Sequence, residues 1–209
     1  MAEKKKPAPK IAATKRKAPV RKTKPQVIAP DPVSPIGDAA MPRAASGNAG
    51  ITLSERLPGS FVQVQAWPDT VAKTQAAIDK HAGEGVTTMP VGPGRWQIES
   101  DAPGLEEALR KALKPEVAAV TGLTHARVVI NASGPKVDWV LASGIALDFA
   151  MMNEGVVALT SHHGIPITLH RLPDQGEART YDLYVTSSYA RDFWGWLIRA
   201  GEEVGLAVA

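Results

Sequence analysis

The histidines offer the first possible chemistry, because imidazole is a common metal ligand. His162 and His163 are adjacent in the sequence, and His170 follows nearby. Adjacent side chains on a strand point to opposite faces, so the pair lacks the spacing of a chelating HxH or HxxxH motif. No HExxH motif accompanies it, and the chain contains no cysteine. The pattern therefore favours solvated histidines in a hairpin turn, and we predict no metal ligand.

The segment Gly92-Pro93-Gly94 offers a second possibility, because glycine-rich loops can cradle phosphate groups. It matches neither GxxxxGK[ST] nor GxGxxG, and it leads into a predicted strand rather than a helix. The segment is therefore predicted to be a turn without a nucleotide role.

Nucleophilic catalysis requires a positioned nucleophile and base, and the sequence supplies no such arrangement. A Gly-x-Ser-x-Gly motif is absent. The acids Asp174, Glu177 and Asp182 lie close together near a predicted hairpin, which is typical of a solvated loop. We therefore predict that this chain has no catalytic and no cofactor-binding residue.

Two pairs of residues are candidates for contact with a partner protein. Arg95 and Trp96 follow the rigid turn, and both residue types are enriched at binding hot spots. The alternative is that Trp96 belongs to the core and Arg95 is solvated. Trp194 and Trp196 lie in a predicted helix, where two positions correspond to about 200°. One of these two indoles is therefore expected to lie under a loop or to contact a partner subunit.

The elements that must position these residues follow from periodicity and from turn residues. Helices are predicted at 69–81, 104–114, 134–143 and 189–204. Strands are predicted at 61–67, 95–99, 155–161, 165–172 and 180–187, and 117–132 reads as a strand pair or one strand bent at Gly122. Helices alternate with hairpins, so we predict an α+β fold with a ferredoxin-like split βαββαβ core.

The charge is divided unevenly along the chain. Residues 1–30 contain ten Lys or Arg and one acid, giving +9, whereas 14 bases and 20 acids give the remainder −6. Residues 1–50 are also rich in Pro and Ala and are predicted to be a disordered tail before a domain at 51–209. The tail is either a polyanion-binding arm or a solubilising extension. Nucleic acid is not the expected partner, because the predicted domain is acidic.

The sequence also indicates the cellular compartment of the protein. No run of about 18 apolar residues occurs, so no membrane span is predicted. The N-terminus lacks the apolar region of a secretory signal, and the chain has no cysteine for disulfides, zinc–thiolate sites or iron–sulfur clusters. We therefore expect a cytoplasmic protein.

Several segments, taken in order, resemble the gamma subunit of heterotetrameric sarcosine oxidase over about residues 55–206. The segments are Gly92–Trp96, Val120–Ile130, Ser133–Pro135, Val140–Asp148, Ser187–Leu197 and Glu202–Gly205. No single motif is diagnostic, but their order and spacing together are specific. The chain departs from the family at 122–127, where a run such as Asp-Leu-Ser usually precedes the arginine, and its basic tail lies outside the pattern.

The resemblance implies a non-catalytic subunit of an oxidoreductase that acts on CH–NH donors with oxygen as acceptor. Such a complex converts sarcosine to glycine and passes the one-carbon unit to tetrahydrofolate. FAD, FMN, NAD, tetrahydrofolate and zinc would then belong to the alpha, beta and delta subunits. The gamma subunit is similar to the first domain of the folate-binding aminomethyltransferases. One alternative is the same role in a complex for another N-methyl amino acid, such as dimethylglycine. The others are a stand-alone folate-binding protein and a protein that binds nucleic acid through its basic tail.

Overall fold

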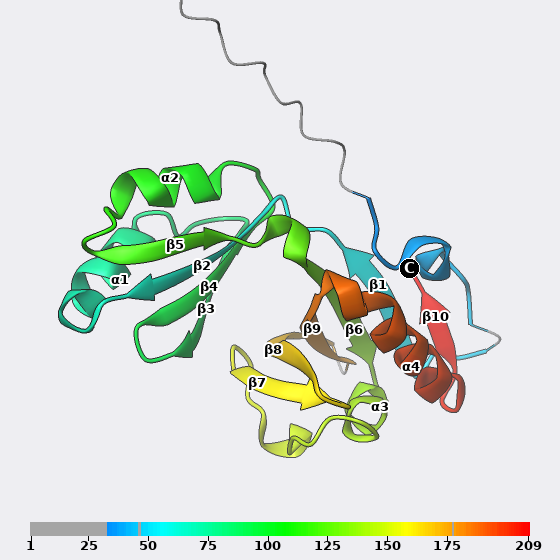
Figure 1. The fold of residues 1–209 in the computed structure, drawn as a ribbon. Coiled ribbons are helices and arrows are strands. Elements are labelled where there is room, and N and C mark those ends of the chain that lie inside the picture. Colours follow the sequence, from blue (N-terminus) through cyan, green and yellow to red (C-terminus); the bar gives the residue numbers. More distant parts are fainter. Residues whose placement is uncertain (1–32, 46, 177) are drawn as a thin grey trace, which may run out of the picture. The chain divides into compact units, whose positions relative to one another are not determined.

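Two β-sheets make up most of the described part of this chain (Figure 1). The structure is a computed structural model, and it describes residues 33–45, 47–176 and 178–209. The described residues belong to one structural unit, Pro32–Ala209. The part of the predicted disordered tail at 1–32 lies outside the described residues.

The four-stranded sheet contains the predicted ferredoxin-like core. Its strands lie in the order β3-β4-β2-β5, and all neighbours are antiparallel. Along the chain its elements are β2 (Ser60–Ala66), α1 (Val71–Asp79), β3 (Val86–Gly92), β4 (Arg95–Ser100), α2 (Leu105–Ala112) and β5 (Ala118–Gly122). This succession and strand order are those of a split βαββαβ unit, so the predicted fold class is confirmed.

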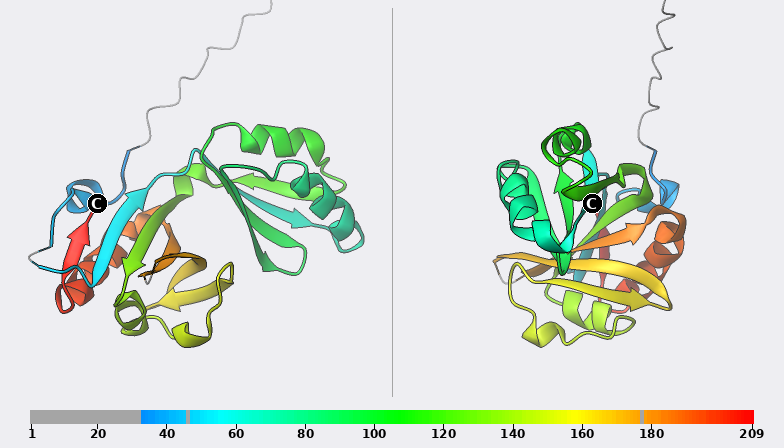
Figure 2. Two further views of the ribbon diagram at one scale, coloured as in Figure 1. Left: turned by 180° about the vertical axis from the view of Figure 1, so that it is seen from behind. Right: turned by 60° about the vertical axis from the view of Figure 1, so that its left-hand side comes forward.

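Both helices of this unit lie on one face of its sheet (Figure 2). Trp96 and Ile98 share that face, as the alternation in β4 predicts, and they pack with Leu105 and Leu109 of α2. Glutamates in the first turn of α2 form ion pairs with bases four positions later, and the helix ends before Pro115. The opposite face of β4 therefore carries the alternate, polar residues.

The six-stranded sheet was not predicted. Its order is β10-β1-β6-β9-β8-β7. Its elements are β1 (Ile51–Arg56), β6 (Arg127–Gly134), α3 (Val137–Ala142), β7 (Val157–His162), β8 (Ile165–Gln175), β9 (Ala178–Thr186), α4 (Ala190–Glu202) and β10 (Leu206–Val208). Short 3₁₀ helices complete the chain: η1 (Gly37–Ala40), η2 (Pro68–Thr70), η3 (Thr124–Ala126), η4 (Phe149–Met151) and η5 (Ser187–Tyr189).

The chain passes between the two sheets at two places, 57–59 and 123–126. The first joins β1 to β2, and the second joins β5 to β6. The predicted strand pair at 117–132 is therefore two strands, but each belongs to a different sheet. These two crossings bring the polar face of the four-stranded sheet toward strands β6 to β9.

The chain already packs against the core before the predicted boundary at residue 51. Ile36 is 1% exposed and belongs to the core of the six-stranded sheet. Arg43 forms a β-bridge with Val208, and the indole of Trp194 donates a 2.9 Å hydrogen bond to the Ala39 carbonyl. Proline content suggested disorder for this segment, but these long-range contacts attach it to α4 and β10.

Removal of the Ile36 side chain is expected to destabilise the whole domain. Ile36→Ala should lower the free energy of unfolding by about 2–4 kcal/mol, because it leaves a cavity in the core. The matched control is Val33→Ala, since Val33 is 83% exposed and its truncation should change stability by less than about 0.5 kcal/mol. Urea unfolding of the full chain measures both, and equal values would show that this segment adds nothing to the core.

Candidate functional site

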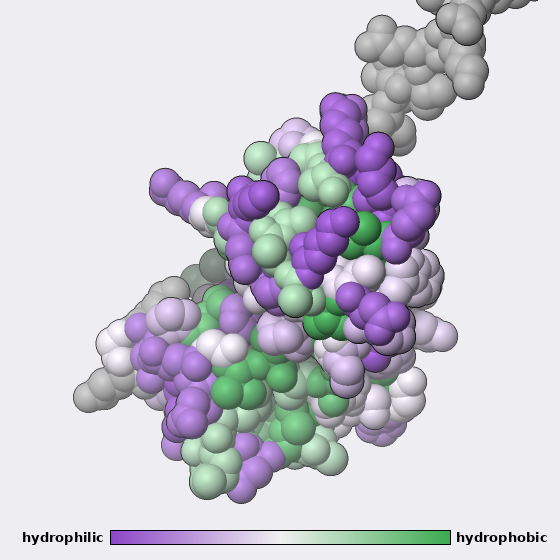
Figure 3. Space-filling model, turned by 90° about the vertical axis from the view of Figure 1, so that its left-hand side faces the viewer, coloured by the Kyte–Doolittle hydropathy of each residue, from purple (hydrophilic) through white to green (hydrophobic). Residues whose placement is uncertain are grey.

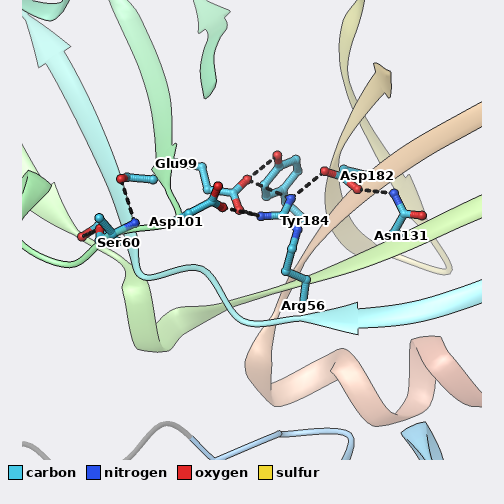
Figure 4. A network of polar contacts seen from close by, with 9 residues as sticks. Arg56, Ser60, Glu99, Asp101, Asn131, Asp182 and Tyr184 are labelled. Carbon is cyan, nitrogen blue, oxygen red and sulfur yellow. Dashed lines mark hydrogen bonds and ion pairs between the residues drawn. The ribbon is translucent and has the colours of Figure 1, made fainter. Parts of the chain in front are cut away.

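The most concentrated polar chemistry of the described chain lies between the two sheets. A small apolar cluster that includes Phe61, Met89 and Tyr184 joins them, with the rings of Phe61 and Tyr184 stacked at 5.4 Å. Beside this cluster the outward-facing residues of β4 meet side chains of β1, β6 and β9. The resulting contact is a network of charged and hydrogen-bonded groups (Figure 4).

Arg56 is the centre of this network. It is the last residue of β1, and its guanidinium pairs with Glu99 on β4 and with Asp182 on β9. The distance from Arg56 Nη2 to Asp182 Oδ2 is 2.7 Å, and from Nη2 to Glu99 Oε2 it is 3.3 Å. One cation is therefore shared by two buried carboxylates, one from each sheet.

Neutral side chains satisfy the remaining carboxylate oxygens. The Tyr184 hydroxyl donates a 2.7 Å hydrogen bond to Glu99 Oε2, and the Asn131 amide donates one of 2.7 Å to Asp182 Oδ1. Glu99 and Asp182 are only 2% and 3% exposed. A buried carboxylate is tolerated only with such partners, so the network holds the two sheets together.

The electrostatics of the network favour ion pairing within the chain over proton transfer. Burial alone would lower the pKa of Arg56, but the charges of Glu99 and Asp182 outweigh it and raise that pKa above its usual value. Burial and the same two carboxylates raise the pKa of Tyr184. Tyr184 therefore remains a neutral hydrogen-bond donor at neutral pH and is not a general base.

The three acids that were predicted to lie in a solvated loop do not share one environment. Asp182 lies inside the inter-sheet network, which corrects its prediction as a solvated residue. Asp174 pairs with the buried Arg171, and Glu177 lies outside the described residues. Among the described residues, no group of three or more His, Cys, Asp or Glu side chains is arranged to hold a metal ion.

The histidine pair also differs from the prediction. His162 is only 5% exposed, its ring stacks on Trp196 at 4.0 Å, and its Nδ1 lies 2.9 Å from the Gly144 carbonyl. Burial lowers the pKa of His162, although the Gly144 contact opposes that effect. A Cβ at Gly144 would lie 2.6 Å from the Trp196 ring, so glycine permits this close packing. His163, at φ 48°, forms the exposed turn.

The four residues expected at a partner contact have different environments. Trp96 is 6% exposed and Trp194 is 1% exposed, so the chain's own core surrounds both indoles. Trp194 lies under the η1 segment, which was one of the two predicted alternatives. Trp196 is half-buried against His162, whereas Arg95 is exposed on β4.

An exposed tryptophan that sequence reasoning missed lies on α3. Trp139 is 51% exposed, whereas Val137, Val140 and Leu141 of the same helix are buried. Residue 139 is about 100° from 140 and about 200° from 137 and 141, so it points away from the buried face. Helical periodicity was the signal that could have identified it. Figure 3 shows one face of the described chain, on which apolar surface gathers beside charged side chains.

Comparison with known proteins identifies a fold relative. No family model matches the chain, and no curated protein sequence matches it. The fold is that of an α+β chain from a multisubunit enzyme. A chain of the heterotetrameric sarcosine oxidase from Corynebacterium sp. U-96, solved in complex with pyrrole 2-carboxylate, matches with a TM-score of 0.70 and 22% identity. The match covers 82% of this chain and 95% of that one.

A second solved structure is far less similar. The regulatory subunit of aspartate kinase from Thermus thermophilus, in its ligand-free form, has a TM-score of 0.37 and 14% identity over 75% of this chain and 99% of that one. A likeness at this level carries no argument. In the described residues, no helix is both long and apolar enough to cross a membrane.

Loss of the Arg56 guanidinium is expected to destabilise the fold strongly. Arg56→Gln leaves two buried carboxylates without a counter-charge and should lower the free energy of unfolding by about 2–4 kcal/mol. The effect is not larger because the Arg56 side chain is 38% exposed and water can partly replace it. Arg110→Gln, at an exposed helical ion pair with Glu106, is the control and should cost less than about 0.5 kcal/mol. Equal losses in chemical denaturation would contradict the role of Arg56.

Acid is expected to destabilise the fold through His162. Because its pKa is lower in the folded than in the unfolded state, the unfolded chain binds the proton first as pH falls below about 6.5. The free energy of unfolding should therefore fall from pH 7 to pH 5. His170, whose pKa burial also lowers, should contribute in the same direction.

Two variants isolate the contribution of His162. His162→Phe keeps an aromatic ring beside Trp196 but removes the titration, so its stability should depend less steeply on pH. His163→Asn removes only the smaller effect of the neighbouring imidazole on the pKa of His162, so its slope should stay close to that of the wild type. Denaturation curves at several pH values give the slopes, and an unchanged slope in His162→Phe would exclude the mechanism.

Proposed function

We propose that this chain is the non-catalytic gamma subunit of a sarcosine oxidase-type complex. Such a complex demethylates sarcosine oxidatively to glycine and passes the one-carbon unit to tetrahydrofolate. In this proposal alpha, beta and delta subunits carry FAD, FMN, NAD, tetrahydrofolate and zinc, and the complex is cytoplasmic. The present chain contributes structure to the assembly.

The observation that carries the proposal is the extent of the fold match. It covers 95% of a chain from a heterotetrameric sarcosine oxidase, so the similarity extends over both sheets and not only over the common βαββαβ unit. The ordered sequence resemblance supports the same assignment independently. The polar network is consistent with a structural role, because its charges are paired and its tyrosine remains protonated.

The partner contact is proposed at the surface formed by α3 and α4, which neighbour each other. Trp139 is exposed there, and Trp196 is half-buried. Large exposed aromatic side chains are frequent anchors of protein interfaces. Trp96 and Trp194 would support this contact only indirectly, because their rings are inside the core.

The proposal predicts that the chain purifies from its native host as part of a flavoprotein complex. An affinity-tagged full chain should elute with larger subunits and a yellow flavin spectrum, and sarcosine should bleach the flavin. Replacing sarcosine by dimethylglycine in the same assay tests the alternative substrate. Recovery of a colourless, solitary protein would contradict the proposed function.

Variants at the proposed contact make this experiment more specific. Trp139→Ser should reduce the amount of flavin recovered per tagged chain, because it removes the exposed anchor. Trp67→Ser is the matched control, since Trp67 is 45% exposed but lies next to α1 on the other sheet. Equal flavin recovery in both variants would place the interface elsewhere while leaving the assembly itself intact.

A further inference from the structure

A cavity of about 230 Å3 lies beside the Arg56 network, between the two sheets. Gln63 and Gln97 line it from the four-stranded sheet, and Arg127 and Thr168 line it from the six-stranded sheet. The cavity is smaller than the roughly 300–1,000 Å3 of sites for drug-sized ligands. It therefore suits a small molecule that contacts both sheets.

The charge of this cavity is not balanced by the described chain. Arg95 and Arg127 both line it, whereas none of its lining residues is an Asp or a Glu. Neither arginine forms an ion pair with a carboxylate among the described residues. A molecule in this cavity would thus be exposed to two uncompensated positive charges.

Arg127 differs in this respect from the other described arginines that are buried or half-buried. Arg56 pairs with Glu99, Arg171 pairs with Asp174, and Arg179 pairs with Asp138. Arg127 Nη1 instead donates to two neutral acceptors, the Ala126 carbonyl and Thr186 Oγ1, each at 3.1 Å. Burial lowers the pKa of Arg127, and no carboxylate offsets that effect. A desolvated cation without a counter-ion is costly, so an anion would be bound favourably here.

A neutral hydrogen-bond donor also faces the cavity. Gln97 Oε1 accepts a 2.9 Å hydrogen bond from the Thr168 hydroxyl, and the two residues are 6% and 5% exposed. This hydrogen bond fixes the orientation of the Gln97 carboxamide. The carboxamide oxygen faces the Thr168 hydroxyl, and the carboxamide amino group therefore faces away from that hydroxyl. The Gln97 amino group is thereby available to an acceptor in the cavity.

We propose that this cavity binds a small organic anion with one or two carboxylates. The guanidinium groups of Arg95 and Arg127 match the planar, two-oxygen geometry of a carboxylate. The Gln97 amino group would donate a further hydrogen bond, and Leu159 and Ile167 supply an apolar wall for a short aliphatic body. Bound in this way, the anion would link the two sheets on the side opposite the helices α1 and α2. The site requires no partner subunit, so it is independent of the proposed function.

Succinate is a suitable probe, and succinamide, its uncharged analogue of the same shape, is the matched control. Calorimetric titration of the full chain should detect succinate, while succinamide or added NaCl at equal ionic strength should produce no saturable heat. Arg127→Gln should weaken succinate binding roughly tenfold or more, which is the effect of losing one charge-assisted hydrogen-bonding group. Arg110→Gln, on the exposed face of α2, should bind as the wild type does.

A second variant distinguishes loss of the binding group from a folding defect. Arg127→Lys keeps the charge but not the two-pronged geometry, so it should bind more weakly than the wild type and more tightly than Arg127→Gln. Equal binding of succinate and succinamide, or unchanged affinity in Arg127→Gln, would overturn the proposal. Failure of the wild-type chain to bind succinate would also overturn it. If Arg127→Gln then lost flavin recovery as well, the arginine would be assigned to a contact with a partner protein.

Discussion

The packing of the two sheets depends on one guanidinium shared by two buried carboxylates. Glu99 and Asp182 come from different sheets, and without Arg56 each would be a buried negative charge. The chain crosses between the sheets directly after Arg56, so the cation lies where both sheets can reach it. Breaking such a pair is far more costly than forming it is favourable, because a single partner left behind is uncompensated. The network therefore disfavours arrangements of the sheets that would separate these groups.

The same interior has two electrostatic regions. Around Arg56 two buried acids share one cation, and hydrogen bonds from Tyr184 and Asn131 satisfy the remaining oxygens. Around Arg127 the charge is positive without a matching acid among the described residues. The first region has no spare cation for an added anion, whereas the second has a partly buried cation that favours one. A chain without an evident catalytic constellation can thus still offer a binding site.

Sequence patterns predicted the local parts of the fold and missed the long-range ones. The βαββαβ unit at 60–122 is made of neighbours in the sequence, and its alternation and turn residues identify each element. β1 escaped prediction because it pairs with β6 and β10, which lie far along the chain. The Arg56 network joins residues 43 and 126 positions apart, and no local pattern records such contacts. Asp182 was therefore predicted to be solvated although it is buried.

The environment of Trp194 and the packing of the segment before residue 51 depend on each other. The angle between Trp194 and Trp196 did not keep either indole away from the core, since Trp194 belongs to the cluster of the six-stranded sheet and Trp196 packs against it. The proline-rich composition of the segment before residue 51 suggested disorder, and this left no part of the chain to cover Trp194. Once that segment packs on α4, Trp194 has its cover and Trp196 has His162. Trp139, at 51% exposure, is then the most exposed tryptophan among the described residues, and for this reason the proposed partner contact lies there.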